Sequence, residues 1–175
     1  MTLIQYTLLK LYWAHFNINQ VHNLIHLYPQ FITENDLTRN ELLVEWLTYQ
    51  SSSSLWKKYE KFKTLKRNNI LSTMKHSSLK FVTYFDQEYP QLLKKIYDFP
   101  YVIFYKGNLK NFNQTNTLAV IGSRKPTHYT TQALEYLFPS FKQINMTVIS
   151  GLAKGADSIA HQTSIKYDLP TVAVL

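Results

Sequence analysis

Hydrophobic positions in the first 75 residues recur at helical spacing. Residues 3–13 and 18–28 have the pattern of two apolar helices, and Pro29 ends the second because proline cannot continue a helix. Thr38 and Glu41 have the spacing of a capping box ahead of an apolar run, which predicts the start of a third helix. We therefore expect a small all-helical module over residues 1–75.

The last predicted helix of this module, over residues 55–68, is rich in lysine. Four apolar side chains at three- and four-residue intervals form one stripe of it: Leu55, Tyr59, Phe62 and Leu65. Residues 57–80 carry eight lysine and arginine side chains against Glu60 alone, in a chain whose net charge is +8. Such a segment suits a polyanion, either nucleic acid or a membrane surface, although a solvated helix face has the same pattern.

The pattern changes after residue 80. Residues 81–85 and 101–105 are rich in β-forming side chains, and a short helix is expected from residue 90 to 96. From there on, apolar strands at 117–121, 147–149 and 171–175 alternate with helical runs that end near residues 142 and 167. This alternation predicts a β-α-β-α-β unit with a parallel sheet, and hence an α/β fold for residues 76–175.

Composition excludes several kinds of chemistry. The 175 residues include no cysteine, so disulfides, thiolate nucleophiles and cysteine-ligated metal centres are ruled out. Apart from His161, the histidines have no ligand spacing with carboxylates, so we expect no metal site and no cofactor. No apolar run approaches the roughly 18 residues of a membrane span, and no signal peptide is recognisable, so we expect a cytoplasmic protein without a membrane partner.

Glycine is scarce, with only 4 in the chain, and most lie in two loops that follow predicted strands. In open α/β sheets, ligands bind at the carboxyl ends of strands, where helix N–H groups are free and glycine lets the backbone approach a phosphate. We expect a phosphate-binding site built from both loops: Gly122, Ser123, Arg124, Lys125, Ser150, Gly151, Lys154 and Gly155. Tight strand-to-helix turns need the same glycines, so that alternative stays open.

A catalytic arrangement is not expected in these loops. Asp157 and His161 lie four residues apart on the helix after the second loop, with Ser123 and Ser150 as candidate hydroxyls. A Ser-His-Asp triad needs the acid to orient the imidazole toward the serine, and neither serine lies in a G-x-S-x-G turn. We expect Asp157 to cap or hydrogen-bond the loop and His161 to pack against it, in a protein that is not an enzyme.

Four stretches resemble the DNA-processing protein A family of natural transformation, also called DprA or Smf. They are Tyr89-Pro-Gln-Leu-Leu-Lys-Lys-Ile96; Asp98-Phe-Pro100 with Phe104-Tyr-Lys-Gly-Asn-Leu109; Val120-Ile-Gly-Ser-Arg124 with Thr127 and Tyr129; and Ser150-Gly-Leu-Ala-Lys-Gly155 with Asp157, Ala160 and His161. The chain departs from the family pattern at Phe99, Thr130 and Ala156, where the family often has proline, glycine and isoleucine. None of these departures touches the first loop.

The resemblance implies an N-terminal SAM-like module over 1–75 and part of a Rossmann-like domain over 76–175. It implies binding of single-stranded DNA, protection of incoming DNA and help in loading RecA recombinase, with a homodimer in the full-length protein. Thr127, Tyr129, Asp157 and His161 would support the DNA site. Family members continue well past Leu175, so we expect this chain to be truncated after the third strand of the Rossmann-like domain.

Two other functions stay open at this point. Related Rossmann-like domains include phosphoribohydrolases that cleave nucleoside monophosphates, and the residues they need would lie beyond residue 175. Alternatively, the basic helix over residues 55–68 is an interaction module that binds a membrane or an acidic partner, with the sheet as a scaffold.

Overall fold

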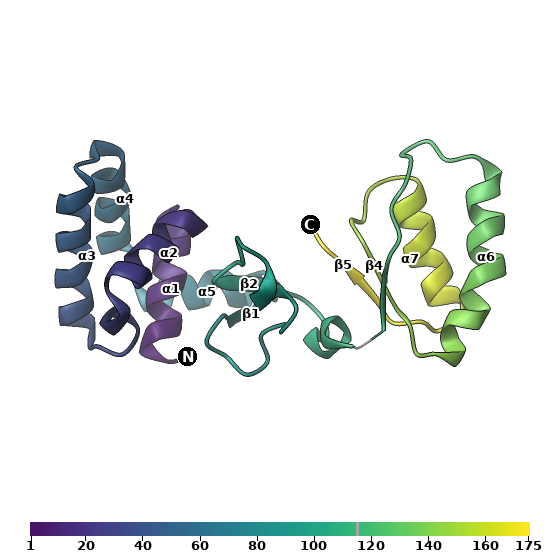
Figure 1. Ribbon diagram of the computed structural model, residues 1–175, viewed down its shortest axis with the longest axis horizontal. Coiled ribbons are helices and arrows are strands. Elements are labelled where there is room, and N and C mark those ends of the chain that lie inside the picture. Colours follow the sequence, from purple (N-terminus) through teal and green to yellow (C-terminus); the bar gives the residue numbers. More distant parts are fainter. Residues whose placement is uncertain (115) are drawn as a thin grey trace. The chain divides into compact units, whose positions relative to one another are not determined.

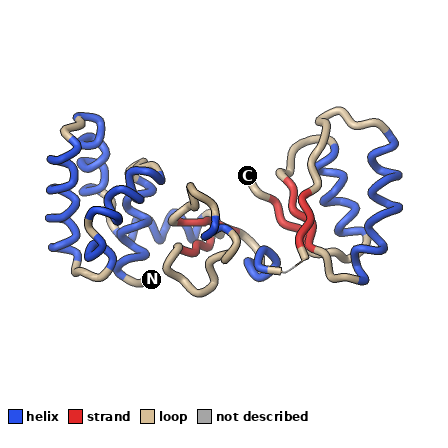
Figure 2. The backbone as a smooth tube through the Cα atoms, in the orientation of Figure 1, coloured by secondary structure: helices blue, strands red, loops and turns tan. Residues whose placement is uncertain are grey.

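The computed structural model describes residues 1–114 and 116–175, which form two compact units, Met1–Gly107 and Asn108–Leu175. Helices dominate the first unit and a parallel sheet organises the second, so the expected α/β class is confirmed (Figures 1 and 2). Among the described residues, no helix combines the length and apolar character needed to cross a membrane.

The first unit begins with the predicted helices. Its α-helices are α1 (Leu3–Trp13), α2 (Ile18–Leu27), α3 (Asp36–Gln50), α4 (Ser53–Thr64) and α5 (Arg67–His76). A 3-10 turn, η1 (Pro29–Ile32), follows α2, so Pro29 ends that helix as predicted. Leu9, Leu43 and Leu47 are completely buried, and Trp46 is 1% exposed, in the core that these helices share.

The predicted capping box at Thr38 is wrong, because α3 begins earlier. Asn35 is the N-cap, and its Oδ1 accepts the N–H groups of Leu37 and Thr38 at 2.9 and 3.1 Å. Asparagine caps helices at least as well as threonine does. The true cap therefore lies three residues upstream, and Thr38 is in the first turn of the helix.

The predicted basic helix over 55–68 is in fact two helices. Leu65 is extended, with φ −73° and ψ 116°, between α4 and α5. Its carbonyl accepts the hydroxyl of Tyr6 on α1 at 3.1 Å, so the group freed by the break is paired. The break allows Ile70 and Met74 of α5 to be buried in the same core as Tyr59.

A β-hairpin completes the first unit. Its strands β1 (Lys80–Thr83) and β2 (Val102–Tyr105) pair antiparallel. Val102 belongs to the helical core, and the ring of Phe104 lies 5.3 Å from that of Trp13 on α1. The first unit thus extends past the boundary expected after residue 75, because the apolar side chains of the hairpin are covered by the helices.

The segment between β1 and β2 is less helical than expected. The predicted helix over 90–96 is reduced to a 3-10 turn, η2 (Leu93–Lys95). Tyr89 is completely buried, and its hydroxyl donates to the carbonyl of Pro100 at 2.7 Å. This hydrogen bond ties the interior of the segment to its end, close to the point where β2 begins.

The second unit is the predicted β-α-β-α-β arrangement. After a 3-10 turn, its elements are β3 (Thr117–Ala119), α6 (His128–Gln143), β4 (Thr147–Ser150), α7 (Ala156–Lys166) and β5 (Thr171–Ala173), and the turn is η3 (Leu109–Asn113). The strands are parallel in the order β3-β4-β5, and both helices lie on one side of the sheet (Figure 1). Phe138, Val148 and Ala160 are completely buried between these layers. This topology places both strand-to-helix loops at one edge of the sheet.

Candidate functional site

The first loop runs from the end of β3 to the start of α6. Gly122, Ser123, Arg124 and Lys125 are all exposed there. The Ser123 hydroxyl accepts the N–H of Lys125 at 3.0 Å, which holds the loop in a tight turn. Arg124 lies inside this turn, so its backbone is held while its guanidinium remains in solvent.

The second loop runs from β4 to α7, and the last residue of β4, from which the loop starts, is buried. Ser150 is 3% exposed, and its hydroxyl donates to the carbonyl of Val120 at 2.6 Å. The Ser150 carbonyl accepts the N–H of Val174 at 2.9 Å, beyond the end of β5. Ser150 therefore joins the ends of three strands, and its hydroxyl is not directed at solvent. Lys154, in the same loop, is exposed.

The two loops are interlocked through Gly155 and Gly122. The N–H of Ala156, the first residue of α7, donates to the Ser123 carbonyl at 3.0 Å. A Cβ on Gly155 would overlap that carbonyl and lie 2.7 Å from the Cα of Arg124. A Cβ on Gly122 would lie 2.8 Å from the Cβ of Ala156. These two glycines are therefore needed for the loops to pack against each other.

Asp157 and His161 form the framework beneath the second loop. Asp157 is 8% exposed, and its Oδ2 accepts the N–H of Gly151 at 3.2 Å. His161 is 7% exposed, and its Nδ1 lies 2.7 Å from the Thr171 hydroxyl on β5. Asp157 therefore hydrogen-bonds the loop, as the sequence predicts, whereas the hydrogen-bond partner of His161 lies on the sheet and not in the loop. The two serines bond elsewhere.

Positive charge at this edge is exposed and unneutralised. Within the described ranges 1–114 and 116–175, Arg124, Lys125 and Lys154 make no ion pair. The nearby Asp157 carboxylate is occupied by the N–H of Gly151. The N-terminal ends of α6 and α7 add partial positive charge at the same edge. The arrangement favours an anion that lies across both loops.

The N-termini of α6 and α7 differ in which hydrogen-bond donors they leave free for a ligand. The first N–H of α7 is used by the Ser123 carbonyl, so that group does not face a ligand. The N-cap of α6 is Thr127, and its hydroxyl makes no capping hydrogen bond among the described residues. A phosphate would therefore find freer donors at α6, next to Arg124 and Lys125.

Exposed apolar side chains flank the charged groups. Ile121 is 81% exposed, Tyr129 is 74% exposed and Leu152 is 53% exposed. The pattern predicted Ile121 as the end of a buried strand, but β3 ends at Ala119. Leu152 has a left-handed backbone, with φ +56°, which turns it outward. The sequence analysis did not include Ile121 and Leu152 among the residues that could contact a ligand. Their only signal in the sequence is that each is a large apolar residue next to a loop glycine.

The structure therefore divides the predicted site residues into two groups. The exposed or loop-forming group lies together at the sheet edge: Gly122, Ser123, Arg124, Lys125, Thr127, Tyr129, Gly151, Lys154 and Gly155. Ser150, Asp157 and His161 lie beneath it and are buried. Two further residues were not predicted as part of the site. The N–H of Ala156 donates to the first loop, but the sequence marked this residue only as a departure from the family pattern. Thr171, whose hydroxyl lies beside His161, belongs to no motif.

The family follows from the comparison of this sequence with known proteins. A family model described as DNA recombination-mediator protein A matches residues 80–175, more than half of the chain. The chain belongs to this family. The match takes in the hairpin and the whole second unit, so both interlocked loops of this family member lie inside it.

Curated members of the family are similar over the same region. The DNA processing protein DprA of Bacillus subtilis is 30% identical over 106 residues, which cover 61% of this chain and 36% of the relative. That of Streptococcus pneumoniae is 36% identical over 90 residues, covering 51% of this chain and 31% of the relative. Protein Smf of Borreliella burgdorferi is 37% identical over 89 residues, covering 51% and 28%. The matched region is thus about a third of the length of these relatives.

A solved structure shares the fold. The X-ray structure of DNA processing protein A from Streptococcus pneumoniae superposes with a TM-score of 0.77, covering 99% of this chain and 57% of that one. The sequence identity in this comparison is 22%, so the likeness concerns the fold alone.

Proposed function

We propose that this chain binds single-stranded DNA through its two interlocked loops, without catalysing a reaction, as part of DNA processing in natural transformation. Family membership and relatives named DNA processing protein support this proposal. The observation that carries it is the junction of Ser123 and Arg124 with Gly155, which presents free cations from a rigid backbone.

The chemistry of the edge suits a strand of nucleotides. Arg124 can hold a phosphate through two parallel N–H donors, and Lys125 and Lys154 add charge beside it. Proteins that bind single strands combine such cations with apolar or aromatic platforms for the bases. Tyr129 and Leu152, exposed at the same edge, provide such platforms.

The test is the binding of a fluorescently labelled oligothymidylate, measured by anisotropy over a range of salt concentrations. Arg124→Ala should weaken binding by about tenfold, since hydrogen bonds to charged groups contribute about 1.5–3 kcal/mol. The slope of log affinity against log salt should become shallower by about 0.7, the value for one phosphate contact on a single strand.

Lys142→Ala is the matched control for this test. Lys142 is also an exposed cation of the second unit, but it lies in the last turn of α6 and pairs with Asp168 at 3.2 Å. Its loss should leave affinity nearly unchanged. Equal effects of the two variants would mean that net charge, and not the loop edge, accounts for binding.

The cellular role is a further part of the proposal. We propose that the protein protects incoming DNA in the cytoplasm, helps to load RecA recombinase onto it, and acts as a homodimer when full-length. Protection of a labelled single strand from nuclease, and faster assembly of RecA on that strand, would support the role. Release of free base from a nucleoside monophosphate would instead favour the phosphoribohydrolase alternative.

A further inference from the structure

A small apolar pocket lies in the first unit, between α1, the start of α2 and the residues that enter β2. Its volume is about 230 Å³. Three of its lining side chains are aromatic, namely Tyr12, Phe16 and Tyr101, and Pro100 adds a flat apolar surface. Pockets for drug-sized ligands measure about 300–1,000 Å³, so this one suits a single ring system.

The aromatic walls are held in place by other rings. Tyr12 is 52% exposed, and its ring centroid lies 4.9 Å from that of Phe104 and 5.7 Å from that of Trp13. The ring centroid of Tyr101 lies 4.9 Å from that of His22 and 5.2 Å from that of Phe99. A ring that enters the pocket would therefore meet surfaces that need little further ordering, which favours binding.

Cationic side chains of α4 lie beside this pocket. Lys58 Nζ is 5.8 Å from the ring centroid of Phe16, and it donates to Gln20 Oε1 at 2.9 Å. The same Oε1 accepts the N–H of Asn17, another lining residue, at 3.0 Å. Lys61 Nζ lies 2.7 Å from His15 Nε2, next to Phe16 in the chain. Lys58 and Lys61 are thus connected to the pocket through Phe16, Gln20 and His15.

These cations have no acidic partner. In the part of the chain that the structure describes, neither Lys58 nor Lys61 makes an ion pair, and the same holds for the exposed Lys57. Lys57 precedes Lys61 by four residues, so both lie on one side of α4. An apolar side chain of a protein would gain nothing from this charge. A nucleobase on its phosphate backbone would instead bind the pocket with its ring and the lysines with its phosphates.

We propose that this pocket takes one unstacked nucleobase of a single-stranded nucleic acid, while Lys57, Lys58 and Lys61 contact the neighbouring phosphates. The proposal rests on the proposed function, since it assigns the first unit a second contact on the same kind of strand. Stacking between the rings of Tyr12 and Tyr101 would tolerate any base, because every base has a flat face.

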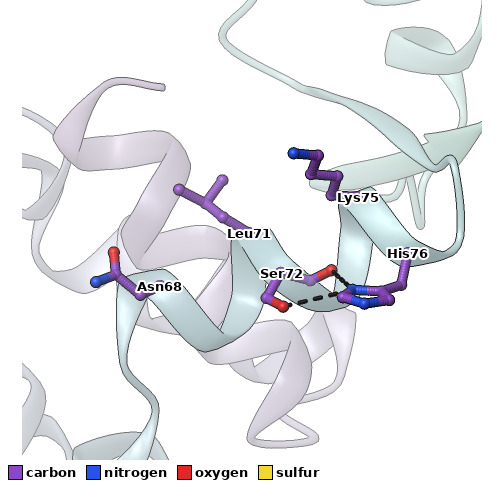
Figure 3. Close-up of a pocket in the computed structure, with 5 residues that line it drawn as sticks. All are labelled: Asn68, Leu71, Ser72, Lys75 and His76. Atoms are coloured by element: carbon purple, nitrogen blue, oxygen red, sulfur yellow. Dashed lines mark hydrogen bonds between the residues drawn. The ribbon is translucent and has the colours of Figure 1, made fainter.

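A second hollow in the first unit lacks these features. It measures about 650 Å³ and is lined by one face of α5: Asn68, Leu71, Ser72, Lys75 and His76 (Figure 3). The imidazole of His76 bonds back to the Ser72 carbonyl at 2.8 Å, and no aromatic ring but this one lines the hollow. It offers nothing to enclose a base, and its exposed Lys75 provides a control cation.

The experiment compares two labelled strands of equal length with the whole chain: an oligothymidylate and the same backbone with abasic sites. Tyr12→Ala should weaken binding of the oligothymidylate by about tenfold, the loss expected for one stacked base. It should leave binding of the abasic strand unchanged. Tyr12→Trp, which retains a flat ring, should bind both strands as the parent does. Thermal melting checks that Tyr12→Ala remains folded.

The lysine–phosphate interactions have their own readout. Lys57→Gln combined with Lys61→Gln should reduce the salt slope by about 0.7 for each phosphate that the protein no longer neutralises, whereas Lys75→Gln should leave the slope unchanged. A strand substituted with 5-iododeoxyuridine should crosslink, under ultraviolet light, to a peptide that contains Tyr12 or Tyr101.

Several results would overturn the proposal. An unchanged affinity for Tyr12→Ala, or an equal loss on both strands, would remove the pocket as a base site and leave an apolar side chain of a protein partner as its occupant. Crosslinks confined to residues 108–175 would do the same. Failure of the proposed function looks different: Arg124→Ala would then have no effect on either strand, whatever Tyr12→Ala does.

Discussion

The two units of this protein handle positive charge in different ways. In the first unit, lysines stand on the outer faces of α4 and α5, and long flexible side chains carry the charge. In the second unit, fewer cations lie on loops whose backbone is fixed by the contact between Gly155 and Ser123. The two units therefore differ less in the kind of charge that they carry than in how firmly the backbone beneath the charge is fixed.

Glycine usage follows the same division. Gly107, in the first unit, has φ +86° but open space around it, so it is needed only for the turn. Gly155, in the second unit, has φ +93° and is pressed against the other loop. The first glycine is conformational, whereas the second also makes room for a tertiary contact.

The largest effect should come from Gly155→Ala. The new Cβ would overlap the Ser123 carbonyl and force a side chain into a positive φ, which together should cost the second unit about 3 kcal/mol. Hydrogen exchange of peptides from residues 108–175 measures this loss. Single-strand affinity should fall with it, because the loops separate.

Gly107→Ala is the matched control, with a comparable φ and no neighbour within 4 Å. Only the backbone strain applies there, about 1–2 kcal/mol, and it falls on the junction between the units. If both variants lowered the stability of their units equally, the contact between the loops at Gly155 would add nothing to the cost of the positive φ.

High pH should affect the first unit selectively. Burial raises the pKa of Tyr89 and of Tyr101 from 10.0 to about 12. Below pH 10 both the folded and unfolded chains hold these protons. Between pH 10 and 12 the unfolded chain loses them while the folded unit retains them, so stability falls as pH rises.

Melting of the first unit should therefore shift down by several degrees between pH 10 and 12. Circular dichroism of the parent protein and of Tyr89→Phe measures this. Tyr89→Phe should lose part of the shift, because one of the tyrosines whose pKa burial raises is gone. It should also be less stable at neutral pH, where the Pro100 carbonyl loses its partner. A variant with the full shift would contradict the assignment to Tyr89.

The smallest effect separates framework from contact residues. Ser150→Ala removes the hydroxyl that donates to the Val120 carbonyl, which should cost about 1.5 kcal/mol by thermal melting. At temperatures where the unit is folded, affinity for a single strand should be unchanged, because Ser150 is buried. Ser140→Ala, on the exposed side of α6, should change stability by less than about 0.5 kcal/mol. A large loss of affinity in Ser150→Ala would move this serine into the binding surface.

Local spacing was enough to predict much of this structure. The helices of the first unit, the parallel β-α-β-α-β arrangement and the loops around Gly122 and Gly155 follow from periodicity and turn residues. The break at Leu65 did not, because no glycine or proline marks it and its carbonyl is paired by Tyr6, far away in the chain. The N-cap at Asn35 was missed because Asn35 and Thr38 are both residue types that cap helices, and spacing alone favoured Thr38.

The candidate site shows the same limit. Its residue types and its place at the strand ends could be read from the chain, since they depend on neighbours along the sequence. Which residues are exposed could not: Ser150 and His161 are buried by partners on other strands, whereas Tyr129 stands in solvent.

The sequence by itself determined the family, the α/β class and the two loops, because motifs and periodicity are local properties. Only the tertiary structure decided that Gly155 locks one loop onto the other, and that Tyr12 and Tyr101 enclose a pocket beside the lysines of α4. The physical reason is that close packing joins residues far apart in the chain, and no spacing along the chain encodes that contact.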